Sequence, residues 1–514
     1  MNKFTTLMAL AAMVFAGKAS ATVYNGQLQV NVNGSVSEQA QPITIVTNGD
    51  ECTLSINNFC LTAGGEKMGV GNIVLKGKAS SKAGDVMELS VKDNVEITAG
   101  TDPSISMWMG PILGQVPIDM KATFSSKVLN TTINIDMMSS LQQIIKVNFI
   151  SDGLQFRNPG FENFHESSES GSNGTEPNGW HSFTSATGPL AKSAGVKVKK
   201  SEEVRPGTDG QASAVLFSSS IFGVIANGTM TTGRLNASSI SAADASNHSF
   251  LDMSKTDKDG NGDPFYTELT NRPDSLNVWV KFKQQKANTS YPYATVSAAI
   301  TNGAYYQDPE GSNTYTNVMA KASNTTIATN GNKWQQLSVP FNYVGSKVDP
   351  KAILVTFSTN ATPGKGGGAD SLYVDDIKLV YNSELDSIKF RGAKLDGWNK
   401  SVDTYNLTAQ GEVTASDFST LGRGQVVNVD VQEVSVSDRK SYVATITSYA
   451  ADMSSKKVYT VNITGVTGVN EVGTNAREIK EIYNLQGVKV SSMERGGVYV
   501  VRYTDGTAAK VIKH

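Results

Sequence analysis

Cysteine and histidine are both rare in this sequence of 514 residues. The two cysteines, Cys52 and Cys60, would lie roughly 26 Å apart along a continuous strand, and a turn at Asn57-Asn58 does not place them opposite each other. Export would permit a disulfide, but two buried free thiols are the better expectation. No metal-ligand spacing relates the four histidines, which stand at positions 165, 181, 248 and 514. The sequence therefore indicates neither a catalytic zinc nor a Ser-His-Asp centre.

Charged residues make up only 18% of the chain, and the net charge is −2. The sequence has no basic block and no RNP-type or zinc-finger spacing, so nucleic acid is not expected as a partner. After the N-terminal segment, no stretch reaches the roughly 18 apolar residues that a membrane-spanning helix needs. No membrane span is predicted.

The abundant residues favour β-structure. The chain contains 47 glycines and is dense in Ser, Thr, Asn and Val, which is typical of β-sandwiches with many turns. A chain of 514 residues is too long for one hydrophobic core, so several domains are expected. The composition predicts an all-β, multidomain protein.

The first residues, "MNKFTTLMALAAMVFAGKASA", have the order of a secretory signal peptide. Lys3 precedes an apolar run, and Ala19-Ser20-Ala21 provides a small-residue cleavage site. A short buried helix is the alternative. Because no cysteine follows the run, lipidation at the cleavage site is not indicated. We predict a signal peptide at 1–21 and a protein that is extracellular or associated with the cell surface or outer membrane, with the periplasm as an alternative.

Residues 22–150 contain short alternating segments, among them "YNGQLQV", "CTLSINNFCL", "ILGQVPIDM" and "IKVNF", separated by turn residues at barrel-like spacing. This pattern resembles the calycin-like domain of secreted proteins from gram-negative gut bacteria. The resemblance implies a lipocalin-related β-barrel and no particular ligand residues.

Residues 151–382 open with "NPGFENF" and "NGW" and close with "LYVDDIKLVY". Together with "NRPDSLNVWVKFK" and "KWQQLSVPFNYV", these motifs resemble the family called "putative carbohydrate metabolism domain". The resemblance implies a jelly-roll β-sandwich. The first and last motifs also resemble the first and last strands of jelly-roll carbohydrate-binding modules.

Two smaller pieces complete the chain. Residues 383–465 include "GWNKSVDTYNL" and "KKVYTVNIT", which are similar to Ig-like, cadherin-like bacterial β-sandwich modules that act as spacers. Residues 466–514 begin with a small linker and end in "GGVYVVRYTDGTAAKVIKH". That ending resembles the C-terminal sorting domain of type IX secretion, which implies the secretion machinery as a partner. A plain terminal hairpin is the alternative.

The segment "SLYVDDIKLVY" alternates as a strand should, but the parity of its apolar residues changes at Asp375-Asp376. A change of parity requires one extra residue, so a β-bulge is predicted there. The resemblance to jelly-roll binding modules implies a structural Ca²⁺ held by Glu162 and Asp376. The alternative is that Asp376 accepts backbone N–H bonds at the bulge and that Glu162 is exposed.

A second candidate for Ca²⁺ is "DKDGNGDPFYTE", which matches the twelve-residue calcium-loop pattern. In that pattern, alternate side chains wrap one ion, a glycine makes the sharp turn and the last residue closes the site in a bidentate manner. Pro264 and the absence of an exit helix weaken the match. A solvated acidic turn is the alternative. The candidate ligands are Asp257, Asp259, Asn261 and Glu268.

Aromatic and polar residues alternate with the apolar residues of three predicted strands. Sugars present apolar C–H faces and hydroxyl groups, so aromatic rings beside amides and a lysine suit them. The alternative is that a loop or a neighbouring domain covers this face. The candidate carbohydrate-binding residues are Trp279, Lys281, Tyr293 and Gln336.

The preferred interpretation is non-catalytic binding of a polysaccharide or glycan by the jelly-roll domain. A glycoside hydrolase that uses carboxylates of residues 151–382 is the second interpretation, but the sequence pairs no two acids at the required separation, and no residue is assigned a catalytic role. A structural or adhesive surface protein without a sugar ligand is the third.

Overall fold

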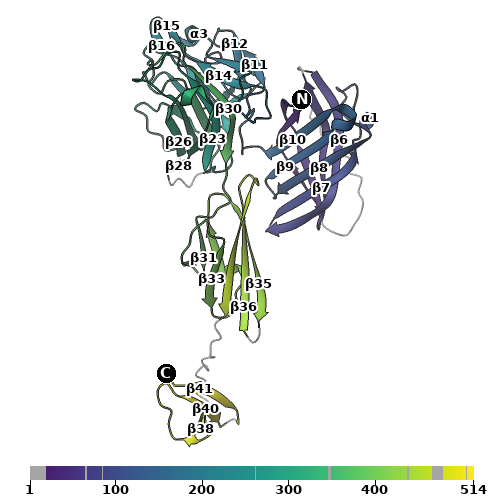
Figure 1. Ribbon diagram of the computed structural model, residues 1–514, viewed down its shortest axis with the longest axis vertical. Coiled ribbons are helices and arrows are strands. Elements are labelled where there is room, and N and C mark those ends of the chain that lie inside the picture. The colour runs from purple at the N-terminus through teal and green to yellow at the C-terminus, as the bar shows by residue number, and fades with distance from the viewer. Residues whose placement is uncertain are drawn as a thin grey trace, which may run out of the picture. The chain divides into compact units, whose positions relative to one another are not determined.

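The computed structural model describes residues 19–63, 66–83, 85–260, 262–344, 349–436, 439–465, 478–504 and 506–513. The predicted signal peptide lies almost wholly outside these residues, as do the linker at 466–477 and Asn261. Strands predominate throughout (Figure 1), which confirms the all-β prediction. In the described part of the chain, no helix has both the length and the apolar character that crossing a membrane requires.

The N-terminal domain is a single curled sheet (Figure 1). Its elements are β1 (Ser20–Tyr24), β2 (Gly26–Val32), β3 (Ser35–Ala40), β4 (Ile43–Asn48), β5 (Glu51–Ala63), β6 (Glu66–Ala83), β7 (Val86–Glu96), α1 (Gly110–Leu113), β8 (Gln115–Phe124), β9 (Leu129–Met137), α2 (Met138–Leu141) and β10 (Gln143–Ser151).

The sheet closes through its first two strands, β1 and β2, which are separated only by Asn25 and together form one bent segment. Strand β1 pairs with β4 at one end of the sheet, whereas β2 pairs with β3 and with the last strand, β10, at the other end. Side chains alternate between buried and exposed along β9, as expected for a strand with one inward face. The inward side chains form one hydrophobic cluster, so the predicted barrel is confirmed. Both cysteines lie in β5 and are free thiols, Cys52 buried and Cys60 half-buried.

The second domain is a two-layered β-sandwich. Sheet 1 has the strand order β13-β14-β30-β23-β27, and sheet 2 has the order β17-β29-β24-β26-β28 with β22 beside β29. Their strands are β13 (Val198–Ser201), β14 (Ser213–Phe217), β17 (Thr229–Thr231), β22 (Thr267–Glu268), β23 (Ser275–Lys283), β24 (Ala294–Thr301), β26 (Val318–Ile327), β27 (Gln335–Pro340), β28 (Asn342–Tyr343), β29 (Ala352–Ser358) and β30 (Ser371–Val380).

The chain crosses repeatedly between the two sheets, as in a jelly roll. Strand β23 in sheet 1 is followed by β24 and β26 in sheet 2, then by β27 back in sheet 1. Shorter elements surround the sandwich: β11 (Phe164–Ser167), β12 (Gly174–Pro177), α3 (Ala191–Ala194), β15 (Ser219–Ile221), β16 (Val224–Ala226), β18 (Arg234–Asn236), β19 (His248–Phe250), β20 (Asp252–Thr256), β21 (Pro264–Phe265), β25 (Gln307–Asp308) and the 3₁₀ turn η1 (Asn330–Asn332).

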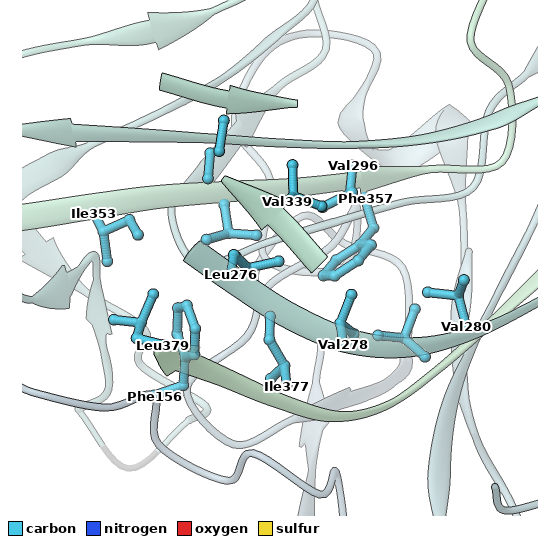
Figure 2. Packing of buried hydrophobic residues seen from close by; sticks show 14 of the residues in the cluster. Phe156, Leu276, Val278, Val280, Val296, Val339, Ile353, Phe357, Ile377 and Leu379 are labelled. Atoms are coloured by element: carbon cyan, nitrogen blue, oxygen red, sulfur yellow. The ribbon is translucent and has the colours of Figure 1, made fainter. Parts of the chain in front are cut away.

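The core of the sandwich lies between the two sheets. Figure 2 shows Leu276, Val278 and Val280 of β23 facing Val296 and Phe357 of sheet 2, all of them buried. Because side chains alternate along each strand, the residues between these positions point to the outer faces. What covers those outer faces decides where a ligand can bind.

The predicted bulge in β30 is confirmed. Asn277 pairs with Lys378 and Trp279 pairs with Asp375, so one residue of β23 opposes two of β30. Asp376 has a φ of 43°, the left-handed conformation found at such irregularities. The apolar residues on both sides of the bulge can therefore face the same core.

The C-terminal part contains two further β-modules. Residues 387–465 form the sheets β32-β31-β34 and β33-β37-β36-β35, and residues 479–512 form the sheet β39-β38-β40-β41. Their elements are β31 (Ser387–Phe390), β32 (Ala393–Lys394), β33 (Thr404–Ala409), η2 (Ala415–Asp417), β34 (Phe418–Leu421), β35 (Val426–Val436), β36 (Arg439–Tyr449), β37 (Lys456–Gly465), β38 (Ile479–Asn484), β39 (Lys489–Val490), β40 (Val498–Tyr503) and β41 (Ala508–Ile512).

Candidate binding groove and carboxylate clusters of the sandwich

A groove of about 560 Å³ lies over the outer face of sheet 2. In β24 and β29 the residues Val296, Ile300, Val355 and Phe357 face the core, so the hydroxyl residues between them point outward. These hydroxyls form the floor of the groove, which we call the sheet 2 groove. Together with two residues of the neighbouring strand β26, they make up the floor: Thr295 and Ser297 of β24, Thr356 and Ser358 of β29, and Ser323 and Thr325 of β26.

Hydrogen bonds hold several of these floor hydroxyls in place. Ser297 donates from Oγ to Oδ2 of Asp308 over 2.5 Å, and the hydroxyls of Ser249 and Thr356 lie 2.6 Å apart. Burial raises the pKa of the Asp308 carboxyl, and the neighbouring Glu310 adds to the effect. Asp308 is the only acid among the described residues that line the groove.

An exposed aromatic residue stands at the wall of the groove. Phe222 and Gly223 form the two-residue turn between β15 and β16, with φ angles of 50° and 79°, which is the pattern of a type I′ hairpin turn. The Phe222 side chain is 78% exposed, and that of Ile240, which also lines the groove, is 61% exposed. The groove thus combines a hydroxyl floor with apolar walls.

The structure divides the four predicted carbohydrate-binding residues between the two sheets. Trp279 and Gln336 are paired neighbours on β23 and β27 of sheet 1, and Lys281 follows on β23. Tyr293 immediately precedes β24 of sheet 2 and is 39% exposed. Its carbonyl accepts a hydrogen bond from the backbone of Ala361, a residue that lines the sheet 2 groove. Tyr293 therefore lies beside that groove, whereas the other three belong to the other sheet.

On the outer face of sheet 1, Lys281 is already partnered. Its side chain is buried, its ammonium forms an ion pair with Glu203, and it lies 4.5 Å from the ring centroid of Tyr373 and 5.2 Å from that of Trp334. The guanidinium of Arg205 covers the half-buried ring of Trp279 at 5.4 Å. Gln336 remains exposed. Cations of the chain itself thus occupy the aromatic faces where a sugar was expected.

At the bulge of β30, Asp375 and Asp376 bind the same arginine. Asp375 is buried and accepts hydrogen bonds from the backbone N–H groups of Arg205 and Asp376 at 3.0 and 2.8 Å. Burial, helped by the nearby Asp376, raises the pKa of Asp375 to about 7. Asp376 forms a 2.5 Å ion pair with Nε of Arg205. Both acids therefore stabilise the bulge and the segment that contains Arg205.

Glu162 lies close to this pair. Its carboxylate accepts hydrogen bonds from the backbone N–H groups of Gln211 and Ala212, and burial raises its pKa. Glu162 and Asp376 both face Gly160, 3.8 and 3.4 Å from the position that a Cβ would take there. The two predicted ligands are thus near each other, but Arg205 neutralises Asp376 and backbone donors already satisfy Glu162.

The second calcium candidate is spread out in the structure. Asp257 is fully buried and turns inward, whereas Asp259 accepts hydrogen bonds from the backbone and hydroxyl of Ser168 at 2.6 and 3.1 Å. Glu268 is exposed on β22 and pairs with Ala352 of β29. Asn261 lies outside the described residues. Within the described residues, the loop does not bring its acids to one point.

Asp257 instead joins a cluster that the sequence analysis missed. One carboxylate oxygen of Asp257, one carboxylate oxygen of Glu176 and one ring nitrogen of His165 all lie within 4.8 Å of one another. His181 Nδ1 lies 3.3 Å from the same carboxylate. His165, Glu176 and His181 lie within 17 residues of one another, but Asp257 follows 76 residues later, and the spacing of the first three matches no metal-ligand motif, so the sequence pattern did not indicate the cluster.

A family model matches the N-terminal barrel, whereas the similar solved structures give no functional information about the sandwich. Residues 21–152 match the family model described as "Calycin-like beta-barrel domain". A crystal structure of a "putative outer membrane protein" from Bacteroides fragilis is similar at 11% identity and a TM-score of 0.16, covering 67% of this chain and 97% of that one. The structure of PNGF-II in its C2 crystal form is similar at 11% identity and a TM-score of 0.13, covering 70% of this chain and 68% of that one.

Neither structural similarity supports an argument about function, because both TM-scores are far below the level of a shared overall fold. A search of curated proteins found no significant match. The match to the calycin-like family model concerns the barrel alone.

Proposed function

We propose that this chain is an exported protein that binds carbohydrate without hydrolysing it, and that the sheet 2 groove is the binding site. The observation that supports this proposal is the combination of an ordered hydroxyl floor with exposed apolar walls in one groove of about 560 Å³. Ligand sites commonly measure 300–1,000 Å³ and place a few fixed polar groups among apolar ones. A sugar ring presents both kinds of surface.

The backbone conformation of Phe222 supports a role in binding. A bulky residue at a positive φ costs of order 1–3 kcal/mol, and such outliers cluster at functional sites. Asn or Gly would occupy this turn position at lower cost. Phe222 nevertheless places a 78% exposed ring at the wall of the groove. A ring of this kind is suited to pack against the C–H face of a sugar.

The groove favours binding over hydrolysis. A glycosidase uses two carboxylates on either side of the scissile bond, about 5–5.5 Å or 6.5–9.5 Å apart. Asp308 is the single acid among the described residues lining the groove, and its Oδ2 accepts a hydrogen bond from the Ser297 hydroxyl. One carboxylate can orient a sugar hydroxyl, but it does not complete a hydrolytic pair.

The outer face of sheet 1 is the alternative location for the same function. Trp279 is half-buried and Gln336 is exposed there, so a sugar that displaced Arg205 from the indole ring would find an aromatic platform beside an amide. This alternative requires breaking the contact between Arg205 and Trp279. The sheet 2 groove requires no such rearrangement.

Affinity electrophoresis of the full chain in gels that contain a panel of plant, host and microbial polysaccharides tests the proposal. The same mixtures are assayed for new reducing ends. We expect retardation by at least one polysaccharide without new reducing ends. New reducing ends would make the protein a hydrolase, and no retardation across the panel would favour the structural or adhesive interpretation.

Three variants locate the site. Phe222→Asn removes the ring but suits the left-handed turn position, so it should abolish retardation without harming the fold. Trp279→Ala tests the outer face of sheet 1, and Leu421→Ala, which removes a 60% exposed apolar side chain outside the sandwich, is the control. Loss of retardation in Trp279→Ala with Phe222→Asn unaffected would move the site to sheet 1.

Calcium binding by Glu162 and Asp376 stays a prediction. A Ca²⁺ held by Asp257, Asp259, Asn261 and Glu268 also stays a prediction. Either ion would be structural, so its removal should lower the melting temperature by mass action. The C-terminal module, by its resemblance to sorting domains, is proposed to contact the secretion machinery.

A further inference from the structure

Four buried or nearly buried side chains from separate segments of the sandwich domain converge on one point. His165 and Glu176 stand opposite each other on the paired strands β11 and β12. His181 follows β12 and is anchored by a backbone bridge to Thr231, and Asp257 begins the turn after β20. Glu176, His181 and Asp257 have no exposed surface. We call these four side chains the His-carboxylate cluster.

The distances within the cluster are short. Asp257 Oδ2 lies 3.3 Å from His165 Nε2 and 3.3 Å from His181 Nδ1. His181 Nδ1 also lies 3.8 Å from Glu176 Oε2. A tetrahedral ion with ligand bonds of 2.0–2.1 Å separates neighbouring ligand atoms by about 3.3 Å. These three distances are close to that separation, and the ligand atoms of His165, Glu176 and Asp257 all lie within 4.8 Å of one another.

Two atoms of the cluster are buried without a hydrogen-bond partner in the described part of the chain, namely Glu176 Oε2 and His181 Nδ1. The other oxygen of Glu176 accepts hydrogen bonds from the backbone N–H groups of Ser182 and Ser185 and from the hydroxyls of Ser182 and Thr184. One oxygen is therefore saturated and held rigidly, while the second points at His181. A buried unsatisfied carboxylate oxygen is costly, so this arrangement indicates a missing partner.

The tautomers of both imidazoles agree with this interpretation. His181 Nε2 lies 3.2 Å from the carbonyl oxygen of Pro264, which can only accept, so Nε2 carries the hydrogen. His165 Nδ1 lies 3.1 Å from the amide oxygen of Asn178. When both rings are neutral, Nε2 of His165 presents a lone pair to Asp257, and Nδ1 of His181 presents one to Asp257 and Glu176. Metal-binding histidines typically donate their other N–H to a carbonyl or carboxylate in this way.

We propose that the His-carboxylate cluster binds one divalent transition-metal ion of the zinc class, with His165 Nε2, His181 Nδ1, Glu176 Oε2 and Asp257 Oδ2 as its four ligands. Two nitrogen lone pairs and two carboxylate oxygens that face each other repel unless a cation lies between them. Mixed imidazole and carboxylate ligands suit zinc, whereas calcium prefers six to eight oxygens. The site therefore differs from both predicted calcium sites in its ligand types, and it shares Asp257 with the second of them.

The metal would be structural. Four protein ligands complete a tetrahedron and leave no position open for substrate. The site joins the hairpin β11–β12, the segment at His181 and the turn that begins at Asp257. The turn packs tightly over the ligands, since a Cβ added at Gly260 would lie 3.0 Å from Asp257 Oδ2 and 3.1 Å from His165 Nε2.

Metal titration of the refolded full chain tests this proposal. The chain is unfolded in guanidinium with a strong chelator, refolded in metal-free buffer and titrated with Co²⁺. We expect the visible absorption of tetrahedral Co²⁺ to saturate at one equivalent and to disappear when Zn²⁺ is added. The melting temperature should rise with either metal. Absence of absorption and of bound metal would mean that protonated imidazoles balance the carboxylates instead, and would overturn the proposal.

Variants provide an independent readout. Glu176→Gln keeps an oxygen for the Ser182 and Ser185 donors and places an amide N–H beside His181 Nδ1. It should abolish the Co²⁺ absorption and raise the stability of the metal-free protein. His248→Ala, which removes a histidine outside the cluster, should leave the absorption unchanged. A Glu176→Gln variant that binds Co²⁺ like the unaltered chain, or a strict preference for Ca²⁺ over Zn²⁺, would contradict the assignment.

Discussion

At the scale of single residues, Phe222 combines an exposed aromatic side chain with a left-handed backbone. Its φ of 50° is one that residues other than Gly, Asn and Asp adopt at a cost. Phe222→Asn should therefore raise the free energy of unfolding by about 1 kcal/mol while it weakens polysaccharide binding. Denaturant unfolding measures the first effect.

Phe222→Ala is the matched control for this prediction, because alanine removes the ring but keeps a Cβ at a positive φ. Its stability should stay close to that of the unaltered chain. If Phe222→Asn were clearly less stable than Phe222→Ala, the conformational argument for this turn would not hold.

Asp308 gives a prediction about pH. Its pKa is raised in the folded protein, chiefly by burial, so the folded state retains its proton at pH values where the unfolded chain, with a pKa near 4, has lost it. The contribution of Asp308 to the free energy of unfolding is therefore fully present below about pH 4, and it is lost as the pH rises through the raised pKa of the folded protein. Asn cannot ionise, so Asp308→Asn should become more stable relative to the unaltered chain as the pH increases from 4 to 8.

Unfolding free energies at several pH values check this prediction. Asp396→Asn, which changes an exposed carboxyl, is the control and should show no comparable trend. A constant difference between Asp308→Asn and the unaltered chain over the whole pH range would count against burial of an ionisable Asp308.

At the scale of elements, the bulge of β30 depends on Arg205. This residue balances the charge of Asp376 and donates its backbone N–H to Asp375, while Glu162 lies nearby. Arg205→Ala leaves these carboxylates without their cation, and we expect a loss of about 2 kcal/mol in the free energy of unfolding.

A double-mutant cycle tests whether the cause is electrostatic. Adding Asp376→Asn to Arg205→Ala should recover part of the lost stability, because it removes the uncompensated charge and Asn tolerates a positive φ. If the two losses simply add, Arg205 acts through its packing on Trp279 rather than through the ion pair.

At the scale of the whole molecule, the barrel and the sandwich each contain their own hydrophobic cluster. Proteins with several domains commonly unfold in more than one step. We expect calorimetry to resolve separate transitions, and Gly26→Ala to lower only the transition of the barrel. A Cβ at Gly26 would overlap the carbonyl oxygen of Ile150 and the ring of Phe149, at the point where β2 meets β10.

Zn²⁺ bound by the His-carboxylate cluster should shift a transition that Gly26→Ala leaves unchanged. Calorimetry of both proteins in metal-free buffer and with one equivalent of Zn²⁺ makes the comparison. A single transition that both perturbations shift by the same amount would show that the domains unfold as one unit.

The sequence by itself determined the strands and the bulge, whereas the barrel was implied by the resemblance of residues 22–150 to calycin-like domains. Side chains alternate every two residues in a strand, so a change of parity at Asp375-Asp376 required an extra residue wherever the strand lay. The same alternation explains why Val278 and Val280 lie in the core and Trp279 lies on the outer face. These features depend on neighbouring residues and are therefore readable along the chain.

Only the tertiary structure decided which outer faces are covered and which polar groups meet. Alternation sends Lys281 outward, but Glu203 and Tyr373, which are distant in sequence, bury it. His165 and Asp257 are 92 residues apart and still lie 3.3 Å from each other. A contact between distant segments leaves no periodic trace in the sequence, because it depends on how the sheets and loops pack and not on the conformation of either segment alone.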